Sequence, residues 1–166
     1  VTNIIFECLE NLKNINIIIV DNGHNDSLII KKIRCNKNII KYFNFKKNIG
    51  FGRACNFAFK YVKTEYTLLI EPDVLIKEKD ILNLINGLKN YPEAAVAVPT
   101  LIDKENTIID ILENLPELNS KEVNLTKSKI NKYNTKNIIA GDTCVNFCWA
   151  AVFLLNNKII KKTGLF

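Results

Sequence analysis

The sequence predicts an α/β fold in which a doubly wound, mostly parallel sheet carries helices on both faces. Two observations indicate this class: short runs of β-branched and aromatic residues alternate with helical patterns, and each run ends in a polar turn. A chain of 166 residues, of which 48% are hydrophobic, can bury one core. We therefore expect a single domain over residues 1–166.

Hydrophobic periodicity places the elements of the first hundred residues in order. A helix is expected over residues 2–13, where Ile5, Leu9 and Leu12 share one face, and the apolar run of residues 15–20 is typical of a strand covered on both sides. Three further strands are expected, over residues 38–43, 66–70 and 94–98. Three helices are expected between the strands: a short helix capped by Asp26 or Ser27 that reaches Ile33, a helix over 51–62, and a helix over 81–89 capped by Asp80. The inward residues of the second helix are Phe51, Cys55, Ala58 and Val62, and the apolar residues of the third are Leu82, Leu84, Ile85 and Leu88. Strands separated by helices imply parallel pairing with right-handed crossovers.

The last third of the chain is less regular. Residues 108–112 form a candidate strand, and residues 113–137 form a polar excursion rich in Lys and Asn. The apolar run of residues 147–155 is expected to return to the sheet as a strand. No internal repeat is visible.

Charge is unevenly distributed along the chain, although its net value is only +6. Residues 31–63 hold ten basic and no acidic side chains, whereas residues 71–122 hold eleven acidic and five basic ones. An anionic ligand would be drawn to the first stretch. A nucleic acid is not expected, because Arg34 and Arg53 are the only guanidinium groups. An ordinary solvated lysine surface is the alternative, since the 21 Lys, 25 Ile and 24 Asn residues indicate an AT-rich coding bias.

The cysteines and the single histidine exclude several catalytic classes. The five cysteines contain no C-x-x-C pair: they are Cys8, Cys35, Cys55, Cys144 and Cys148. With His24 as the only histidine, no zinc-site spacing exists, and a Cys/His nucleophilic pair would have to recruit His24 from a loop. Free thiols in a reducing compartment are therefore expected.

No apolar run is long enough to span a bilayer. The run of residues 149–155 is far shorter than the roughly 20 residues required, and no charged leader precedes an apolar signal segment. We therefore expect a cytoplasmic protein. Because residue 1 is Val1 rather than Met, we also expect the chain to be part of a longer protein.

Three polar turns follow the expected strands. They are Asp21-Asn22-Gly23, residues 48–53 (Asn-Ile-Gly-Phe-Gly-Arg, here the glycine turn) and Glu71-Pro72-Asp73 (here the acidic turn). In open α/β sheets, ligands bind beyond the carboxyl ends of the strands, where all three turns would lie. The turns are therefore the candidate ligand site.

The glycine turn is suited to approach a phosphate. Gly50 and Gly52 let backbone N–H groups at a helix start come close to a ligand, and Arg53 adds positive charge. The turn lacks the G-K-[S/T] of a Walker loop, and Cys55 stands where a dinucleotide-binding fingerprint has its third glycine. A glycine-assisted turn into a helix, without any ligand, is the alternative.

The acidic turn is suited to a divalent cation. Glu71 and Asp73 can present carboxylate oxygens to a hard cation shared with a ligand's phosphates, and Pro72 fixes the local backbone direction. Solvated or helix-capping acids are the alternative. Asp21, at the end of the first expected strand, can accept from a base N–H or a ribose hydroxyl, with an Asx-turn as its alternative.

Four segments together resemble the family 2 glycosyltransferases of GT-A fold, in particular their bacterial rhamnosyltransferase-like branch. IIIVDNGHNDS resembles the family's strand and V-D-N-G-S-x-D turn, NIGFGRACNFAF its N-x-G-F-G-x-[GA]-x-N segment, and LLIEPDV its strand ending in N-P-D or D-x-D. CWAAVFLLNNKIIKKTGLF is similar to the segment that leads into the family's acceptor-side loop. The resemblance implies a Rossmann-like nucleotide-sugar-binding half over residues 1–100 and a partial acceptor-side half over residues 101–166.

The resemblance also implies an activity and a set of site residues. The activity is inverting, metal-assisted transfer of a sugar from a nucleoside diphosphate donor to a glycan, lipid-linked or protein acceptor, as in cell-surface polysaccharide biosynthesis. Asp21 would recognise the base, and Asp73 would bind Mg²⁺ or Mn²⁺ on the diphosphate. The donor-binding residues implied are Asp21, Asn22, Gly23, Asn48, Gly50, Phe51, Gly52, Arg53, Asn56 and Glu71.

The chain departs from the family pattern at three positions and at both ends. Glu71 replaces Asn or Asp, His24 replaces Ser, and Cys55 stands where Arg or a small or polar residue is frequent. The family's general base follows the G-L-F segment, so no catalytic residue is assigned here, Asp142 included. We therefore expect the chain to be truncated at both ends, since its first residues resemble only the tail of the family's first strand.

Two alternatives to an active transferase stay open. One is a donor-binding but inactive fragment, and the other is a nucleotidyltransferase-like domain that binds a nucleoside triphosphate beside Arg53. Peripheral contact with the inner face of the cell membrane, through lysines of residues 31–63 or 121–136, is a further possibility.

Overall fold

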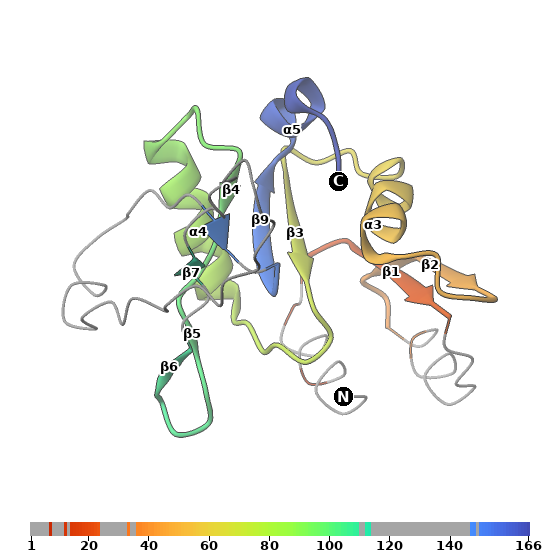
Figure 1. Ribbon diagram of the computed structural model, residues 1–166, viewed down its shortest axis with the longest axis horizontal. Helices are drawn as coiled ribbons and strands as arrows, with labels where there is room; N and C mark the ends of the chain where they lie inside the picture. The colour runs from red at the N-terminus through yellow and green to blue at the C-terminus, as the bar shows by residue number, and fades with distance from the viewer. Residues whose placement is uncertain are drawn as a thin grey trace, which may run out of the picture.

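The computed structural model describes residues 7, 12, 14–23, 33, 36–109, 112–113, 147–148 and 150–166. Its elements are β1 (Ile17–Asn22), β2 (Ile39–Phe45), α3 (Phe51–Phe59), β3 (Tyr66–Ile70), α4 (Glu78–Asn90), β4 (Val96–Ala97), β5 (Leu101–Ile102), β6 (Ile108–Ile109), β7 (Leu112–Glu113), β8 (Phe147–Cys148), β9 (Val152–Asn156) and α5 (Asn157–Thr163). In Figure 1, β1, β2 and α3 lie together on one side of β3 and β9, and α4 lies on the other. The fold is therefore of the α/β class that the sequence predicts.

β1 and β2 form a parallel pair, as the alternation of strands and helices predicts. In their register Asp21 lies opposite Asn44, and Asn22 lies opposite Phe45. β1 continues to Asn22 and β2 to Phe45, beyond their predicted ends at residues 20 and 43. Asp21 and Asn22, expected in a turn, are therefore strand residues, because β2 supplies hydrogen-bond partners that no local pattern encodes.

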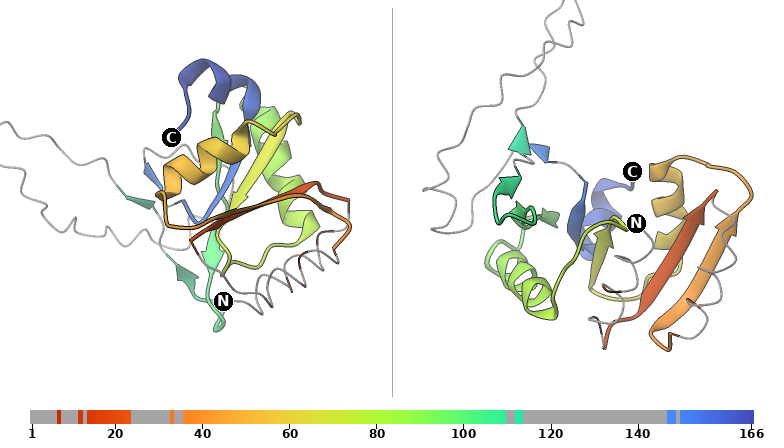
Figure 2. Two further views of the ribbon diagram at one scale, coloured as in Figure 1. Left: turned by 90° about the vertical axis from the view of Figure 1, so that its right-hand side faces the viewer. Right: turned by 90° about the horizontal axis from the view of Figure 1, so that it is seen from below.

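β9 lies between β3 and β4 and runs antiparallel to both (Figure 1). The short pairs β5–β6 and β7–β8 are also antiparallel, so among the strands described only β1 and β2 pair in parallel. The expected mostly parallel sheet is thus a mixed arrangement in the described part of the chain. Hydrophobic runs predict that a strand forms, but they carry no information on its direction. The β5–β6 hairpin projects away from the sheet in both Figure 1 and Figure 2.

β9 is the most deeply buried strand of the described residues. Val152, Leu154 and Leu155 are only 1%, 2% and 0% exposed. Consecutive strand residues point to opposite faces, so burial of both leucines means that both faces of the sheet are covered at this point. Val152 also belongs to a core cluster with Leu12 and Ile81. The single strand predicted over residues 147–155 is instead two: β8, which pairs with β7, and β9, which supplies the centre of the core.

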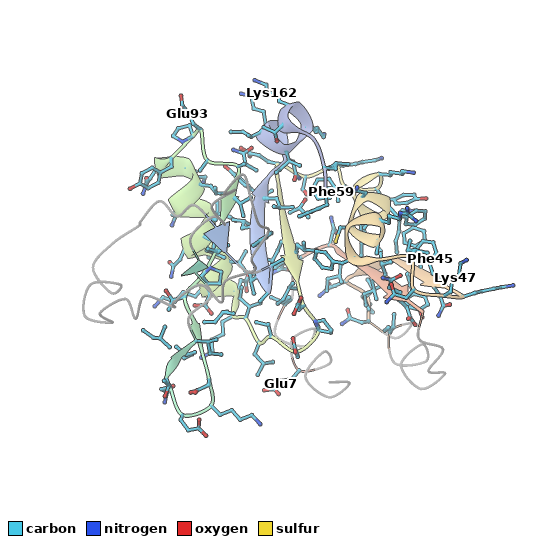
Figure 3. All side chains as sticks on the ribbon, viewed as in Figure 1. Glu7, Phe45, Lys47, Phe59, Glu93 and Lys162 are labelled. Atoms are coloured by element: carbon cyan, nitrogen blue, oxygen red, sulfur yellow. The ribbon has the colours of Figure 1, made fainter. Side chains whose placement is uncertain are left out.

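α3 packs on β2 through aromatic rings. Phe57 contacts Phe43 and Phe45 edge to face, at ring-centroid distances of 4.8 and 5.1 Å. Tyr61 lies 4.8 Å from the Phe43 ring, and the Lys41 ammonium lies 4.8 Å above the centroid of Tyr61. Figure 3 shows Phe45 beside α3, on the side of the molecule where β2 ends. Part of the lysine-rich stretch therefore covers aromatic surface.

The predicted inward face of α3 is partly wrong. Cys55 is buried as expected, together with Ala54, but Phe51 is 47% exposed. The helix also ends at Phe59 instead of residue 62. Phe51 is the first residue of the helix and lies next to solvent. The contacts of Phe57 with Phe43 and Phe45 determine which face of α3 packs on β2.

The predicted cap of α4 is also in a different position. The helix begins at Glu78, so Asp80 lies within its first turn instead of before residue 81. The Asp80 carboxylate still accepts from the Lys77 N–H at 3.1 Å, which satisfies a donor at the helix start. Leu82, expected on the apolar face, is 55% exposed. β4 covers only Val96–Ala97 of the strand expected over residues 94–98.

Several predictions fall outside the described residues. Of the helix expected over residues 2–13, only Glu7 and Leu12 are described, and Glu7 is helical. Ile33, the end of the next expected helix, is likewise helical. Residues 114–137 of the polar excursion, His24 and Asp142 lie outside the described part of the chain.

A buried asparagine anchors α5 to the start of β3. Asn157 is 2% exposed, and its Nδ2 donates to the Thr64 carbonyl and to the Thr67 hydroxyl, both at 2.8 Å. Its backbone N–H donates to the Glu65 carbonyl at 3.0 Å. The Asn157 Oδ1 has no hydrogen-bond partner among the described residues. The two bonds from Nδ2 must therefore offset the desolvation of this amide.

Replacing this anchor is expected to destabilise the fold. Asn157→Ala should lower the free energy of unfolding by about 2 kcal/mol, because the Thr64 carbonyl and the Thr67 hydroxyl both lose the bond from the buried Asn157 amide. Urea denaturation followed by circular dichroism measures the change. Asn83→Ala, at an exposed position of α4, is the control and should stay within about 0.5 kcal/mol of the parent. Equal effects of the two substitutions would contradict the anchoring role.

Candidate functional site

A set of hydrogen bonds, here the clasp, joins the end of β1 to the glycine turn. The Asn22 Oδ1 accepts from the Ile49 N–H at 2.9 Å, and the Asn22 Nδ2 donates to the Asn48 Oδ1 at 3.0 Å. The same Asn48 oxygen accepts from the Gly50 N–H at 2.8 Å. Two of the three predicted turns are therefore in direct contact.

The clasp requires a glycine at position 23. Gly23 has φ +107°, and a Cβ there would lie 2.7 Å from the Asn48 nitrogen and 3.0 Å from the Lys47 carbonyl carbon. Gly50 also has a positive φ, +90°, but a Cβ there would meet nothing within 4 Å. Gly50 thus serves the backbone turn alone, whereas Gly23 also lets two chain segments approach each other.

Asp21 lies beside the clasp, between side chains of β2. Its Oδ2 accepts from the Tyr42 hydroxyl and from the Asn44 Nδ2, each at 3.0 Å, and Asn44 also donates to the Tyr42 oxygen at 3.2 Å. Tyr42 and Asn44 are two residues apart on β2, so their side chains lie on the same face of the strand, where they meet Asp21. Sequence reasoning missed both, because their approach to Asp21 depends on strand register.

The start of α3 carries backbone donors next to the clasp. Helical bonding begins with the Ala54 N–H to Gly50 carbonyl bond at 3.1 Å, so the first N–H groups, at residues 51–53, have no helical acceptor. Gly50 forms no side-chain cap on this helix. Phe51 and Arg53 are exposed. These donors and the Arg53 guanidinium can together meet an anion.

Asn56 contacts a segment far away in sequence, residues 164–166, here the arm. Its Nδ2 donates to the Phe166 backbone oxygen at 2.6 Å, and its Oδ1 accepts from the Phe166 N–H at 3.1 Å. Phe166 also lies over Gly52, where a Cβ would come within 3.3 Å of the Phe166 Cβ. Sequence reasoning missed Phe166, since no local signal links it to α3.

The acidic turn leaves β3 at its carboxyl end. The Glu71 N–H donates to the Ala151 carbonyl at 3.0 Å, and the Val74 N–H donates to the Glu71 carbonyl at 3.3 Å. These bonds hold the turn against the chain that enters β9. The side chains of Glu71 and Asp73 are exposed. Both carboxylates are therefore available to a ligand from solvent.

A protein cage for a metal ion is not found among the residues that the structure describes, where no three His, Cys, Asp or Glu side chains gather. Mg²⁺ is commonly held by one or two carboxylates together with substrate phosphates and water. The exposed oxygens of Glu71 and Asp73 fit a metal ion shared with substrate phosphates and water, and they do not form a cage of protein ligands alone.

The Cys55 thiol does not fit a nucleophile. Burial raises the pKa of this thiol above its ordinary value, so it is protonated and unreactive at neutral pH. His24, its only possible imidazole partner in the chain, lies outside the described residues. Within the described part of the chain, no helix is long and apolar enough to cross a membrane.

The geometry predicts unequal costs for two glycine substitutions. Gly50→Ala should cost about 1–3 kcal/mol through backbone strain alone, because its Cβ would meet open space. Gly23→Ala should cost more, because it adds a clash with the Asn48 backbone to the same strain. Urea denaturation of both variants measures the difference. A smaller loss for Gly23→Ala than for Gly50→Ala would refute the close approach.

Comparison with known proteins finds one family model that matches the chain. The model of glycosyl transferase family 2 matches residues 2–162, nearly the whole chain. No curated protein matches the chain. The match includes β1, the glycine turn and the acidic turn in one span. The chain therefore belongs to glycosyl transferase family 2.

Proposed function

We propose that the chain binds a nucleoside diphosphate sugar and transfers the sugar, with inversion, to a hydroxyl of a glycan, lipid-linked or protein acceptor. The observation that carries this proposal is the clasp, which joins the end of β1 to the glycine turn in a family 2 chain. The complete sheet would have the GT-A arrangement with helices on both faces. Residues 1–100 would bind the donor, and residues 101–166 would form part of the acceptor side.

The donor would lie across the clasp. The Asp21 carboxylate, oriented by Tyr42 and Asn44, would accept a hydrogen bond from the base. The N–H groups at the start of α3 and the Arg53 guanidinium would meet the diphosphate. The clasp supports this arrangement because it holds the glycine turn in place before the ligand arrives, which lowers the ordering cost of binding.

The acidic turn would hold the metal ion. Asp73, with Glu71 beside it, would bind Mg²⁺ or Mn²⁺ that is shared with the diphosphate. When bound, the ion would stabilise the negative charge that the departing diphosphate gains. The hydrogen bond from Glu71 to the Ala151 carbonyl keeps this turn in a fixed place.

Transfer with inversion requires the acceptor oxygen to attack the anomeric carbon from the side opposite the diphosphate. A base must remove the acceptor's proton as the new bond forms. No residue of the described part of the chain is assigned this role.

The acceptor and the location of the chain are proposed from its sequence motifs and its exposed lysines. A rhamnosyltransferase-like specificity and a role in cell-surface polysaccharide biosynthesis would suit the motifs of the glycine and acidic turns. Exposed lysines before, along and after β2, at positions 37, 41, 46 and 47, would favour peripheral contact with the inner face of the cell membrane. Figure 3 shows Lys47 at the outer end of this side of the molecule.

Removing the metal ligand is expected to abolish metal-dependent binding. Titration calorimetry with UDP, dTDP and GDP should show binding by the parent chain that Mn²⁺ strengthens. Asp73→Asn should weaken binding in Mn²⁺ about tenfold and leave binding in EDTA unchanged. Glu93→Gln, an exposed acid beyond α4 (Figure 3), is the matched control and should behave as the parent.

Three results would contradict the proposal or favour its alternatives. Nucleotide binding that Mn²⁺ does not strengthen, or that is equally strong in Asp73→Asn, would contradict the proposed role of Asp73 as a metal ligand. Preference for nucleoside triphosphates would favour the nucleotidyltransferase-like alternative. Diphosphate binding with no sugar transfer to any glycan acceptor would favour the donor-binding, inactive alternative.

The nucleobase of the donor is expected to present a ring N–H to Asp21. Uracil, thymine and guanine have such a donor, whereas the cytosine ring nitrogen is an acceptor, so UDP should bind more tightly than CDP. Asp21→Ala should weaken UDP binding about tenfold or more, through loss of a charge-assisted hydrogen bond, and should change CDP binding little. Calorimetry with both nucleotides measures this. Equal losses for UDP and CDP would show that Asp21 acts only on the fold.

A further inference from the structure

The arm is seated on α3 by contacts of three kinds. Asn56 gives one hydrogen bond to the Phe166 backbone and receives one, which together hold this backbone on the helix. The Phe51 and Phe166 rings meet edge to face at 6.1 Å. The absent Cβ of Gly52 leaves the space into which Phe166 packs. Gly52 and Asn56 lie one helical turn apart, so α3 presents both on one face.

The arm is directed to α3 by the end of α5. Gly164 has φ +107°, and its N–H donates to the Ile160 carbonyl at 3.0 Å, which closes the helix and turns the chain. Two views agree that the last residues return beside α3 (Figure 1, Figure 2). The buried Asn157 holds the other end of α5 on β3. The arm therefore joins α3 to the strands around β9.

The start of α3 needs such support. The helix has only nine residues, no side-chain cap at Gly50 and no acidic residue in its first turn. A short helix of this kind is marginal without tertiary contacts. The clasp holds the turn before the helix, and the arm holds the first two helical turns from the other side.

We propose that Asn56 is a positioning residue that acts on donor binding through the arm and does not touch the donor itself. This inference rests on the proposed function, because it concerns the helix start that would meet the diphosphate. The Asn56 Nδ2 and Oδ1 both bond the Phe166 backbone, which favours an effect on the ligand that passes through residues 51–53. Docking of the arm keeps their N–H groups ordered for the diphosphate.

A double-mutant cycle on donor binding tests this role. Asn56→Leu removes the amide, and Phe166→Ala removes the ring without touching the Asn56 amide. Each single variant should weaken binding of UDP with Mn²⁺ about fivefold, and the double variant should be no weaker than the weaker single variant, since both open the same arm. Asn86→Leu, at an exposed position of α4, is the control.

Two further measurements complete the experiment. Asn56→Leu should speed amide hydrogen exchange at Phe166, whose N–H loses its acceptor, and UDP with Mn²⁺ should slow this exchange in the parent chain. Circular dichroism confirms that each variant is folded. Phe166 is 50% exposed, so its replacement leaves the core intact.

The outcomes separate this inference from the proposed function. Additive losses of binding affinity in the cycle would overturn the inference, because they would show that Asn56 contacts the donor. Unchanged UDP binding by Phe166→Ala would also overturn the inference, because it would show that the arm does not affect donor binding. In both cases donor binding by the parent chain would stand. Absence of metal-dependent binding in the parent chain would overturn the proposed function and, with it, this inference.

Discussion

The insertion of β9 between β3 and β4 is the constraint on which the rest of the structure depends. Leu154 and Leu155, at 2% and 0% exposure, are buried on opposite faces of this strand. The chain just before β9 accepts the hydrogen bond that holds the acidic turn, and Asn157 just after it anchors α5 to β3. One strand therefore positions both the candidate metal ligands and the helix from which the arm returns to α3.

Side-chain amides join the segments around the glycine turn. Asn22, Asn48 and Asn56 each use amide atoms to bond backbone groups of other segments or of their own turn. An amide carries both donors and an acceptor, so it can replace a missing backbone partner in either direction. The 24 asparagines of the chain reflect composition in part, but these three have specific structural roles. The region around the glycine turn is therefore built from polar contacts at its surface, while β9 supplies apolar burial.

The accuracy of the sequence-based predictions follows from the range of the interactions concerned. The strand over residues 66–70 forms where predicted, because its run of β-branched and apolar residues is a local property. The first two turns were also expected at one edge of a sheet, where parallel strands end, and their contact agrees with that placement. The direction of β9, the exposure of Phe51 and the placing of Asp21 within β1 were missed. Each of these depends on a partner distant in sequence.

The sequence by itself determined the α/β class, the positions of the main strands and the residue types of the three turns, because periodicity and turn chemistry act over a few residues. Only the tertiary structure decided that Gly23 must pass the Asn48 backbone, that Tyr42 and Asn44 orient Asp21, and that Asn56 bonds Phe166. These contacts require strand register and the return of a distant segment. The pairing of β1 with β2 sets the register, and the burial of β9 sets where the distant segment returns. A local pattern of residues contains neither.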